Sequence, residues 1–180
     1  MKTTNKLLTL IIIFSSLFSL QSQNKFSKRK IENLKEEVSQ LVEDDKKMTQ
    51  VMIDKVFSFG ELGFQEFETS KYLGKILEEN GFDVEYQISD IPTSWLATWS
   101  NGEGGPTIAL GSDFDGVPST SQYPGVAYEK PVVEGAPGHG EGHNIGLPIV
   151  ITSAIAIKKI MIENNINGKL VLWPGVAEEI

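Results

Sequence analysis

The sequence predicts a layered α/β domain, because segments with helical periodicity alternate along the chain with short strand-like segments. In the helical segments apolar residues recur every three or four positions, and these segments are 27–59, 66–80 and 145–162. The strand-like segments are short, rich in branched and aromatic residues and bounded by turn formers, and they are 82–88, 95–99, 107–110 and 169–173. A chain of 180 residues is long enough for one domain with a substantial core.

The ends of the helical segments carry the residues that usually begin and stop helices. Ser27 is expected to cap the first helix, which is predicted to run without a break to about Phe59. Gly60 is expected to stop that helix, and Asn80 with Gly81 to stop the next one.

The first residues have the pattern of a secretory signal peptide. Lys2 and Lys6 precede an apolar run of 14 residues, 7–20, which is shorter than the roughly 20 residues that a membrane-spanning helix needs. We expect residues 1–23 to be this signal, with cleavage between Leu20 and Asn24, and the product to be periplasmic or secreted. If the segment stayed attached, the chain would instead be a membrane-anchored protein.

Composition excludes several classes of function. The 16 Lys and Arg against 24 Asp and Glu give a net charge of −8, which repels nucleic acids and anionic membranes. We therefore predict no nucleic-acid partner and no membrane association after signal cleavage. The chain has no cysteine, so any metal ion must be held by His, Asp or Glu.

Three short segments collect the side chains that could perform chemistry. The first follows the predicted strand 107–110, where Asp113 and Asp115 stand two residues apart and would point the same way on an extended chain. They could bind a cation or orient a ligand imidazole. The alternative is an Asp-rich turn, which is common in loops.

The second segment, 139–144, begins within a glycine-rich stretch, 111–142, that is too long to be a simple connection. It holds the only two histidines of the protein, His139 and His143, with Glu141 between them. A carboxylate and an imidazole beside flexible glycines suit zinc or manganese. A structural role for either histidine remains the alternative.

The third segment is Glu178 and Glu179, which follow the predicted strand 169–173. One of two adjacent carboxylates can bind a metal ion while the other accepts a proton from water. Alone, such a pair is as readily explained as solvated charge.

Four motifs in order resemble the signature of the M20 metallopeptidases, in the amidohydrolase branch that includes aminoacylases and proteins similar to aminobenzoyl-glutamate hydrolase. The likeness runs from about residue 30 to residue 180. The motifs are Gly60-Glu61-Leu62-Gly63-Phe64-Gln65-Glu66 with Thr69, Gly111-Ser112-Asp113-Phe114-Asp115-Gly116-Val117-Pro118, Gly135-Ala136-Pro137-Gly138-His139-Gly140-Glu141-Gly142-His143-Asn144, and Ala177-Glu178-Glu179.

The resemblance implies a layered α/β/α catalytic domain of the zinc-exopeptidase type, with a mixed sheet between helices. It also implies two divalent metal ions, zinc or manganese, and hydrolysis of an N-acyl amino acid or a similar small amide. By position, His143 and Glu179 would be metal ligands, Glu141 the residue between the two ions, and Glu178 the general base.

Two further aspartates match positions of the family pattern. Asp115 corresponds to the acid that orients a ligand, and Asp113 stands where other branches have a ligand histidine, which makes it a weaker metal candidate. His139 matches a motif histidine that is not assigned as a ligand. Glu141 stands where many members have cysteine, and the change should favour harder ions.

Family members are usually about twice as long as this chain. We therefore expect residues 24–180 to be the N-terminal part of the catalytic domain, without the lid and dimerisation domain, and the full-length parent to be a homodimer. Three ligands cannot fill two metal coordination spheres, so this chain alone is expected to be inactive and its status as an enzyme is left open. The rival hypothesis is a non-catalytic exported binding protein that retains half of the fold.

Overall fold

The computed structural model describes residues 26–180. The predicted signal peptide, residues 1–23, lies outside the described residues. The chain divides into two compact units, 1–36 and 37–180. Of the first unit the structure describes the start of helix α2, where the Ser27 hydroxyl accepts a hydrogen bond from the Lys30 N–H at 3.2 Å. The predicted N-cap is thus in place.

The prediction of one helix from Ser27 to Phe59 is wrong at Asp45. Helix α2 spans Lys28–Asp44 and helix α3 spans Lys46–Phe59, and Asp45 between them has φ −89° and ψ 7°. A run of acidic residues is unfavourable at the C-terminus of one helix and favourable before the N-terminus of the next, which explains a break at this point. Helix α3 ends as predicted at Gly60, which adopts a left-handed conformation.

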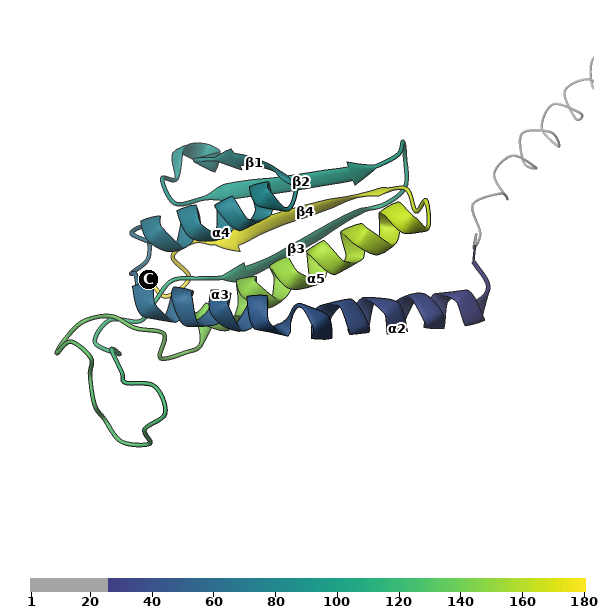
Figure 1. Ribbon diagram of the computed structural model, residues 1–180. Helices are drawn as coiled ribbons and strands as arrows, with labels where there is room; N and C mark the ends of the chain where they lie inside the picture. Colours follow the sequence, from purple (N-terminus) through teal and green to yellow (C-terminus); the bar gives the residue numbers. More distant parts are fainter. Residues whose placement is uncertain (1–25) are drawn as a thin grey trace, which may run out of the picture. The chain divides into compact units, whose positions relative to one another are not determined.

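The remaining elements follow the sequence prediction closely (Figure 1). Two more long helices are present, α4 (Phe67–Glu79) and α5 (His143–Glu163). The strands and the one short 3-10 helix are β1 (Asp83–Tyr86), η1 (Ile88–Asp90), β2 (Trp95–Asn101), β3 (Thr107–Asp113) and β4 (Gly168–Gly175).

The four strands form one mixed sheet in the order β1-β2-β4-β3. Strands β1, β2 and β4 are antiparallel neighbours, whereas β3 runs parallel to β4 with Asp113 opposite Gly175. The carboxyl ends of β3 and β4 therefore meet at one edge of the sheet. At this edge, each of the two strands is followed by a segment that holds candidate site residues.

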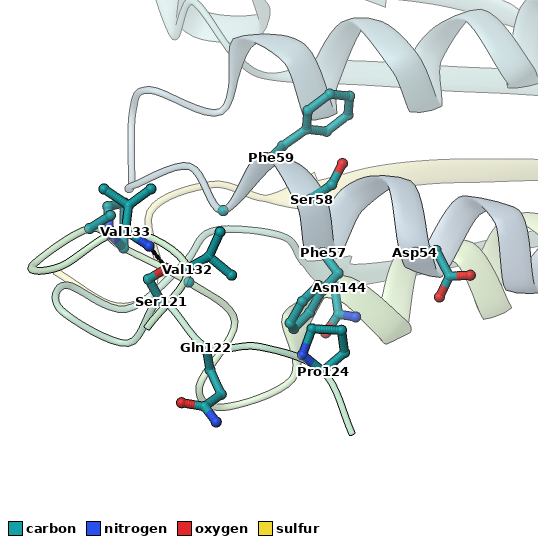
Figure 2. A pocket seen from close by; sticks show the side chains of 14 residues that line it. Asp54, Phe57, Ser58, Phe59, Ser121, Gln122, Pro124, Val132, Val133 and Asn144 are labelled. Carbon is teal, nitrogen blue, oxygen red and sulfur yellow. Dashed lines mark hydrogen bonds between the residues drawn. The ribbon is translucent and has the colours of Figure 1, made fainter. Parts of the chain in front are cut away.

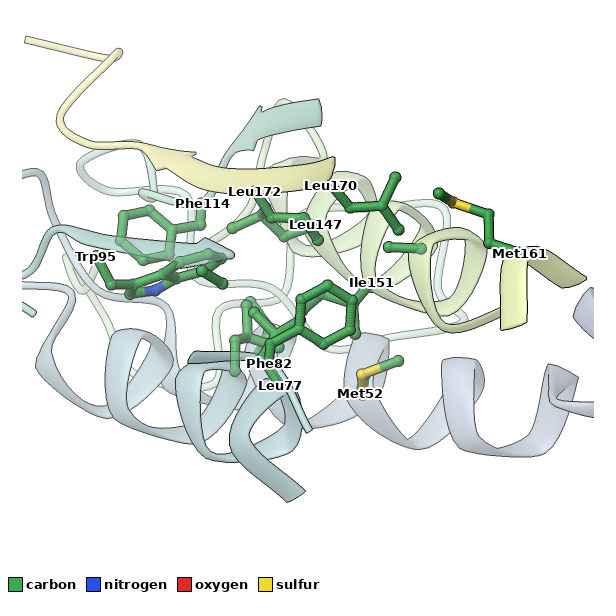
Figure 3. Close-up of a cluster of buried hydrophobic side chains, with 14 residues drawn as sticks. Met52, Leu77, Phe82, Trp95, Phe114, Leu147, Ile151, Met161, Leu170 and Leu172 are labelled. Carbon is green, nitrogen blue, oxygen red and sulfur yellow. The ribbon is translucent and has the colours of Figure 1, made fainter. Parts of the chain in front are cut away.

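One face of the sheet carries the hydrophobic core of residues 37–180 (Figure 3). Leu170 and Leu172 of β4 are fully buried, while Lys169 before them and Trp173 after them are exposed. The buried face packs against α4 and α5, and apolar side chains of α3, which packs against these two helices, join the same cluster. The layered α/β class and the mixed sheet are confirmed. The described residues include helices on this face, and the second helical layer of an α/β/α arrangement is not among them.

Helix α5 is long and apolar enough, by length and composition, to cross a membrane. The core accounts for this composition, because Leu147, Ile151 and Ala154 are fully buried between the sheet and α3. A core helix with apolar residues on most sides is the simpler explanation.

Candidate metal centre

His143 begins helix α5 and lies at the centre of the candidate site. Gly142, the residue before the helix, has φ 116°, a value that favours glycine. The side chain of His143 is 12% exposed, and its Nε2 lies 2.9 Å from the Glu141 carboxylate. Its Nδ1 lies 3.8 Å from Glu179 and its Nε2 4.0 Å from Glu178. The predicted segment at the start of α5 and the predicted segment after β4 therefore meet at this imidazole.

Asp115 contacts this imidazole through a buried carboxylate. The side chain is fully buried, and Oδ1 lies 3.2 Å from His143 Nδ1. Oδ2 accepts a hydrogen bond from the Glu179 N–H at 2.9 Å. Because a carboxylate can only accept, this contact requires a proton on Nδ1 and leaves the Nε2 lone pair of a neutral ring free for a metal ion.

Three side chains form a group that could hold a metal ion. One ligand atom from each of Glu141, His143 and Glu179 lies within 4.8 Å of the others. Glu141 is well exposed and Glu179 is mostly buried. An imidazole nitrogen and two carboxylate oxygens suit a divalent ion, and the buried Asp115 holds the imidazole in the required tautomer. The residues present thus fit such an ion.

Glu178 and Asp113 lie beside this group and outside it. The Glu178 carboxylate is exposed and faces the Nε2 side of His143, where a proton acceptor would stand next to a bound ion. Asp113 ends β3 next to Gly175 of β4, where a side chain on residue 175 would collide with its carboxylate. The metal-binding role of Asp113 and the catalytic role of Glu178 remain predictions.

The charges around His143 alter its protonation. Burial lowers the pKa of His143, but the carboxylates of Glu141, Asp115 and Asp113 outweigh that effect and raise the pKa above its usual value. In the metal-free protein the ring therefore holds a proton more strongly. A metal ion and a proton compete for Nε2.

His139, which the sequence did not favour as a ligand, is not a member of this group. It is buried and its Nε2–H donates to the Val56 carbonyl oxygen at 3.1 Å. Burial lowers the pKa of His139. A neutral structural histidine is consistent with this environment.

A cavity of about 750 Å³ lies near the site, between α3 and the loop 116–142. Figure 2 shows Phe57 and Phe59 of α3 on one side and Pro124, Val132 and Val133 of the loop around it. The cavity shares no lining residue with the group of three metal-ligand candidates. Of the residues that line the cavity, Asn144 is the nearest in sequence to this group, because it directly follows His143.

Known proteins with similar sequence and structure identify the family. No protein-family model matches the chain. The chain is 30% identical to one subunit of the p-aminobenzoyl-glutamate hydrolase of Escherichia coli over 142 residues, which are 79% of this chain and 29% of that protein. It is 30% identical to N-acetylcysteine deacetylase of Bacillus subtilis over 122 residues, 67% of this chain and 30% of that protein.

A solved structure agrees with these relatives. A dinuclear metal-binding peptidase of the M20 family from Bacillus subtilis superimposes with a TM-score of 0.60 and 26% identity, over 76% of this chain and 37% of that one. The chain belongs to the M20 amidohydrolase family. It spans less than a third of the length of the two curated relatives.

Within this M20 chain, one residue near the site was not predicted from the sequence. Glu66 is fully buried and accepts a hydrogen bond from the Ala177 N–H at 3.0 Å, next to the Glu178–Glu179 pair. The contact joins residues 111 positions apart. No local sequence pattern predicts such a contact. The only signal in this region was the motif that contains Glu66.

Proposed function

We propose that this chain supplies metal-binding and proton-accepting residues to a metal-dependent hydrolase of small amides, such as N-acyl amino acids or peptide-like compounds. The observation that carries the proposal is the group of Glu141, His143 and Glu179, with the tautomer of His143 set by the buried Asp115. The reaction class is supported by the relatives, which are a subunit of p-aminobenzoyl-glutamate hydrolase and N-acetylcysteine deacetylase.

The residues have different tasks according to their positions. Glu141, His143 and Glu179 would hold divalent ions, zinc or manganese, with Asp113 as a weaker additional candidate. Glu141 lies 2.9 Å from His143 Nε2, the nitrogen that would be free for an ion, and by its position in the family motif it would be the residue between the two ions. When bound, such an ion acts as a Lewis acid that polarises a carbonyl and lowers the pKa of water from 15.7 to about 7.

Glu178 would move the proton. Its carboxylate lies 4.0 Å from His143 Nε2 and is exposed, so it can reach a water molecule at the site without being a ligand itself. As general base it would accept a proton from water and later donate it to the leaving amine. Asp115 would keep the His143 ring oriented throughout.

The test combines ion binding with turnover. Titration calorimetry with Mn²⁺ and with Zn²⁺ should detect binding by the chain, and the protein purified from its source should release amino acid from N-acetyl amino acids only with the ion present. Glu178→Gln should keep ion binding and lose at least about 100-fold in turnover, whereas Glu163→Gln on the exposed end of α5 should change neither. Absence of ion binding by the unaltered chain would refute the proposal.

A non-catalytic binding protein is the second candidate. The cavity of about 750 Å³, lined largely by apolar side chains from α3 and the loop 116–142, favours it because the cavity is separate from the metal candidates. In that case an apolar small molecule would bind with an affinity that EDTA does not change. Ion-dependent amide hydrolysis would exclude this second candidate as the main function.

Export is a separate proposal. Residues 1–23 have the signal pattern described above, which supports a periplasmic or secreted product. Sequencing the N-terminus of the purified protein should find a start between residues 21 and 24. An N-terminus that retains Lys2 would contradict export by this signal.

A further inference from the structure

The segment 60–66, between α3 and α4, contacts all three segments that carry candidate site residues. The Glu61 carbonyl oxygen accepts a hydrogen bond from the Gly116 N–H at 2.7 Å, directly after Asp115. Gly60 lies against Pro137, because a Cβ on residue 60 would be 3.1 Å from the Pro137 carbonyl oxygen. The segment is therefore in a position to hold the site segments together.

The third contact is with the turn that precedes Glu178 and Glu179. Gly63 packs against Ala177, and a Cβ on residue 63 would lie 2.9 Å from Ala177 Cα. Ala177 has φ 58°, a left-handed conformation that is strained for alanine and must be held by its surroundings. Glu66 provides the hydrogen bond to this residue.

The Glu66 carboxylate is fully buried, and both of its oxygens are engaged. Oε1 accepts from the Ala177 N–H at 3.0 Å and Oε2 from the Thr93 hydroxyl at 2.7 Å. Its partners are a backbone N–H and a hydroxyl, both neutral. A carboxyl group that is removed from water in this way is costly, so a specific role is expected for it.

Two buried carboxylates thus hold the backbone on either side of Glu178. Glu66 accepts from the N–H of residue 177, and Asp115 accepts from the N–H of Glu179 at 2.9 Å. Asp115 also contacts His143, whereas Glu66 touches no candidate ligand through its side chain. The two contacts together fix the direction in which Glu178 and Glu179 leave the backbone.

We propose that Glu66 is a positioning residue, which acts through the Ala177 N–H to aim Glu178 and Glu179 at the metal centre. The proposal rests on the proposed function, because it assigns a task to the residue that orients the proposed ligand and general base. Glu66 itself binds neither ion nor substrate.

Three variants test the proposal through Mn²⁺ affinity, measured by calorimetry on the full chain. Glu66→Met keeps the volume and removes the acceptor, and it should weaken Mn²⁺ binding at least about 10-fold. Glu66→Gln should stay within about 2-fold, because its amide oxygen can accept from Ala177 while its NH₂ group donates to Thr93. Thr93→Val, the matched control, removes the other hydrogen bond and should also stay within about 2-fold.

A second readout does not depend on the ion. In ¹⁵N-alanine-labelled protein the Ala177 amide should exchange slowly with solvent in the unaltered chain and in Glu66→Gln, and faster in Glu66→Met. Circular dichroism establishes that each variant is folded. If Glu66→Met does not fold, Gly63→Ala displaces the same turn from the other side and should weaken Mn²⁺ binding at least about 10-fold.

The outcomes separate the two proposals. If the unaltered chain binds Mn²⁺ and folded Glu66→Met binds it equally well, Glu66 is not a positioning residue and the proposed function stands. If Thr93→Val weakens Mn²⁺ binding as much as Glu66→Met does, the effect comes from a general loss of packing around residue 66. Glu66 then has no specific positioning role. If the unaltered chain binds no ion, the proposed function and this proposal fail together.

Discussion

At the scale of single residues, Asp115 is expected to set which nitrogen of His143 is free to bind an ion. Its buried carboxylate accepts from Nδ1–H and from the Glu179 N–H. In Asp115→Asn only one of these donors keeps an acceptor, because the amide NH₂ must face the other. Ion affinity should fall about 10- to 100-fold in calorimetry. Glu85→Gln on the exposed side of β1 is the control, and an equal affinity in both variants would contradict the role of Asp115.

The two histidines should affect acid stability in opposite directions in the metal-free protein. Burial lowers the pKa of His139, so its contribution is present above the usual pKa of about 6.5 and is lost as the pH falls toward the folded-state value. Although burial opposes it, nearby carboxylates raise the pKa of His143. The stabilisation from His143 is therefore present below pH 6.5 and is lost as the pH rises through its raised pKa.

Urea unfolding at pH 8 and pH 5.5, with EDTA present, measures this difference. His139→Gln should lose less stability on acidification than the unaltered chain, and His143→Gln should lose more. Each variant is the control for the other, because the chain contains only these two histidines. Equal losses in the two variants would show that their environments do not differ as described.

At the scale of elements, helix α5 combines a buried face with an exposed one. Ile151 is fully buried in the core and Ile149 is 48% exposed, two positions away. Ile151→Ala should lower the free energy of unfolding by about 2–5 kcal/mol, since it removes buried methyl groups and leaves a cavity. Ile149→Ala should change it by about 0.5 kcal/mol or less. Equal losses in urea titrations would mean that α5 does not pack as a core helix.

The periodicity and turn residues of the sequence were sufficient to predict the elements but not all of their limits. The apolar spacing continues through Asp45, so the break between α2 and α3 was missed, although the acidic run 43–45 was the local signal. The order of the strands in the sheet could not be predicted from the sequence either. The pairing of β2 with β4 joins segments about 70 positions apart, and such a pairing depends on tertiary packing rather than local preference.

At the scale of the whole unit 37–180, the site forms where parallel strands end and a helix begins. The predicted positions of Asp115, His143 and Glu179 follow from that rule, because β3, α5 and β4 each deliver one of them to the same edge. Glu66 could not be predicted in this way. Its contact with Ala177 exists only after the residue before α4 and the turn after β4 have come together in the fold, so the contact is visible only in the structure.

The same arrangement predicts that an ion stabilises the folded unit. The three candidate ligands come from a loop, the start of α5 and the turn after β4, and unfolding separates them. An ion that binds only the folded state at 100 times its dissociation constant adds about 2.7 kcal/mol to the free energy of unfolding. Thermal unfolding should therefore shift upward with saturating Mn²⁺ and return with EDTA.

His143→Gln provides the decisive comparison for this stabilisation, because it removes the central ligand and keeps a side chain of similar length. The variant should lose most of the Mn²⁺-dependent shift, whereas His139→Gln should keep it, since His139 faces the Val56 carbonyl rather than the group. A shift of equal size in both variants would place the ion elsewhere on this acidic chain. A shift that only His143→Gln abolishes would tie the stability of the folded unit to the three segments that meet at that imidazole.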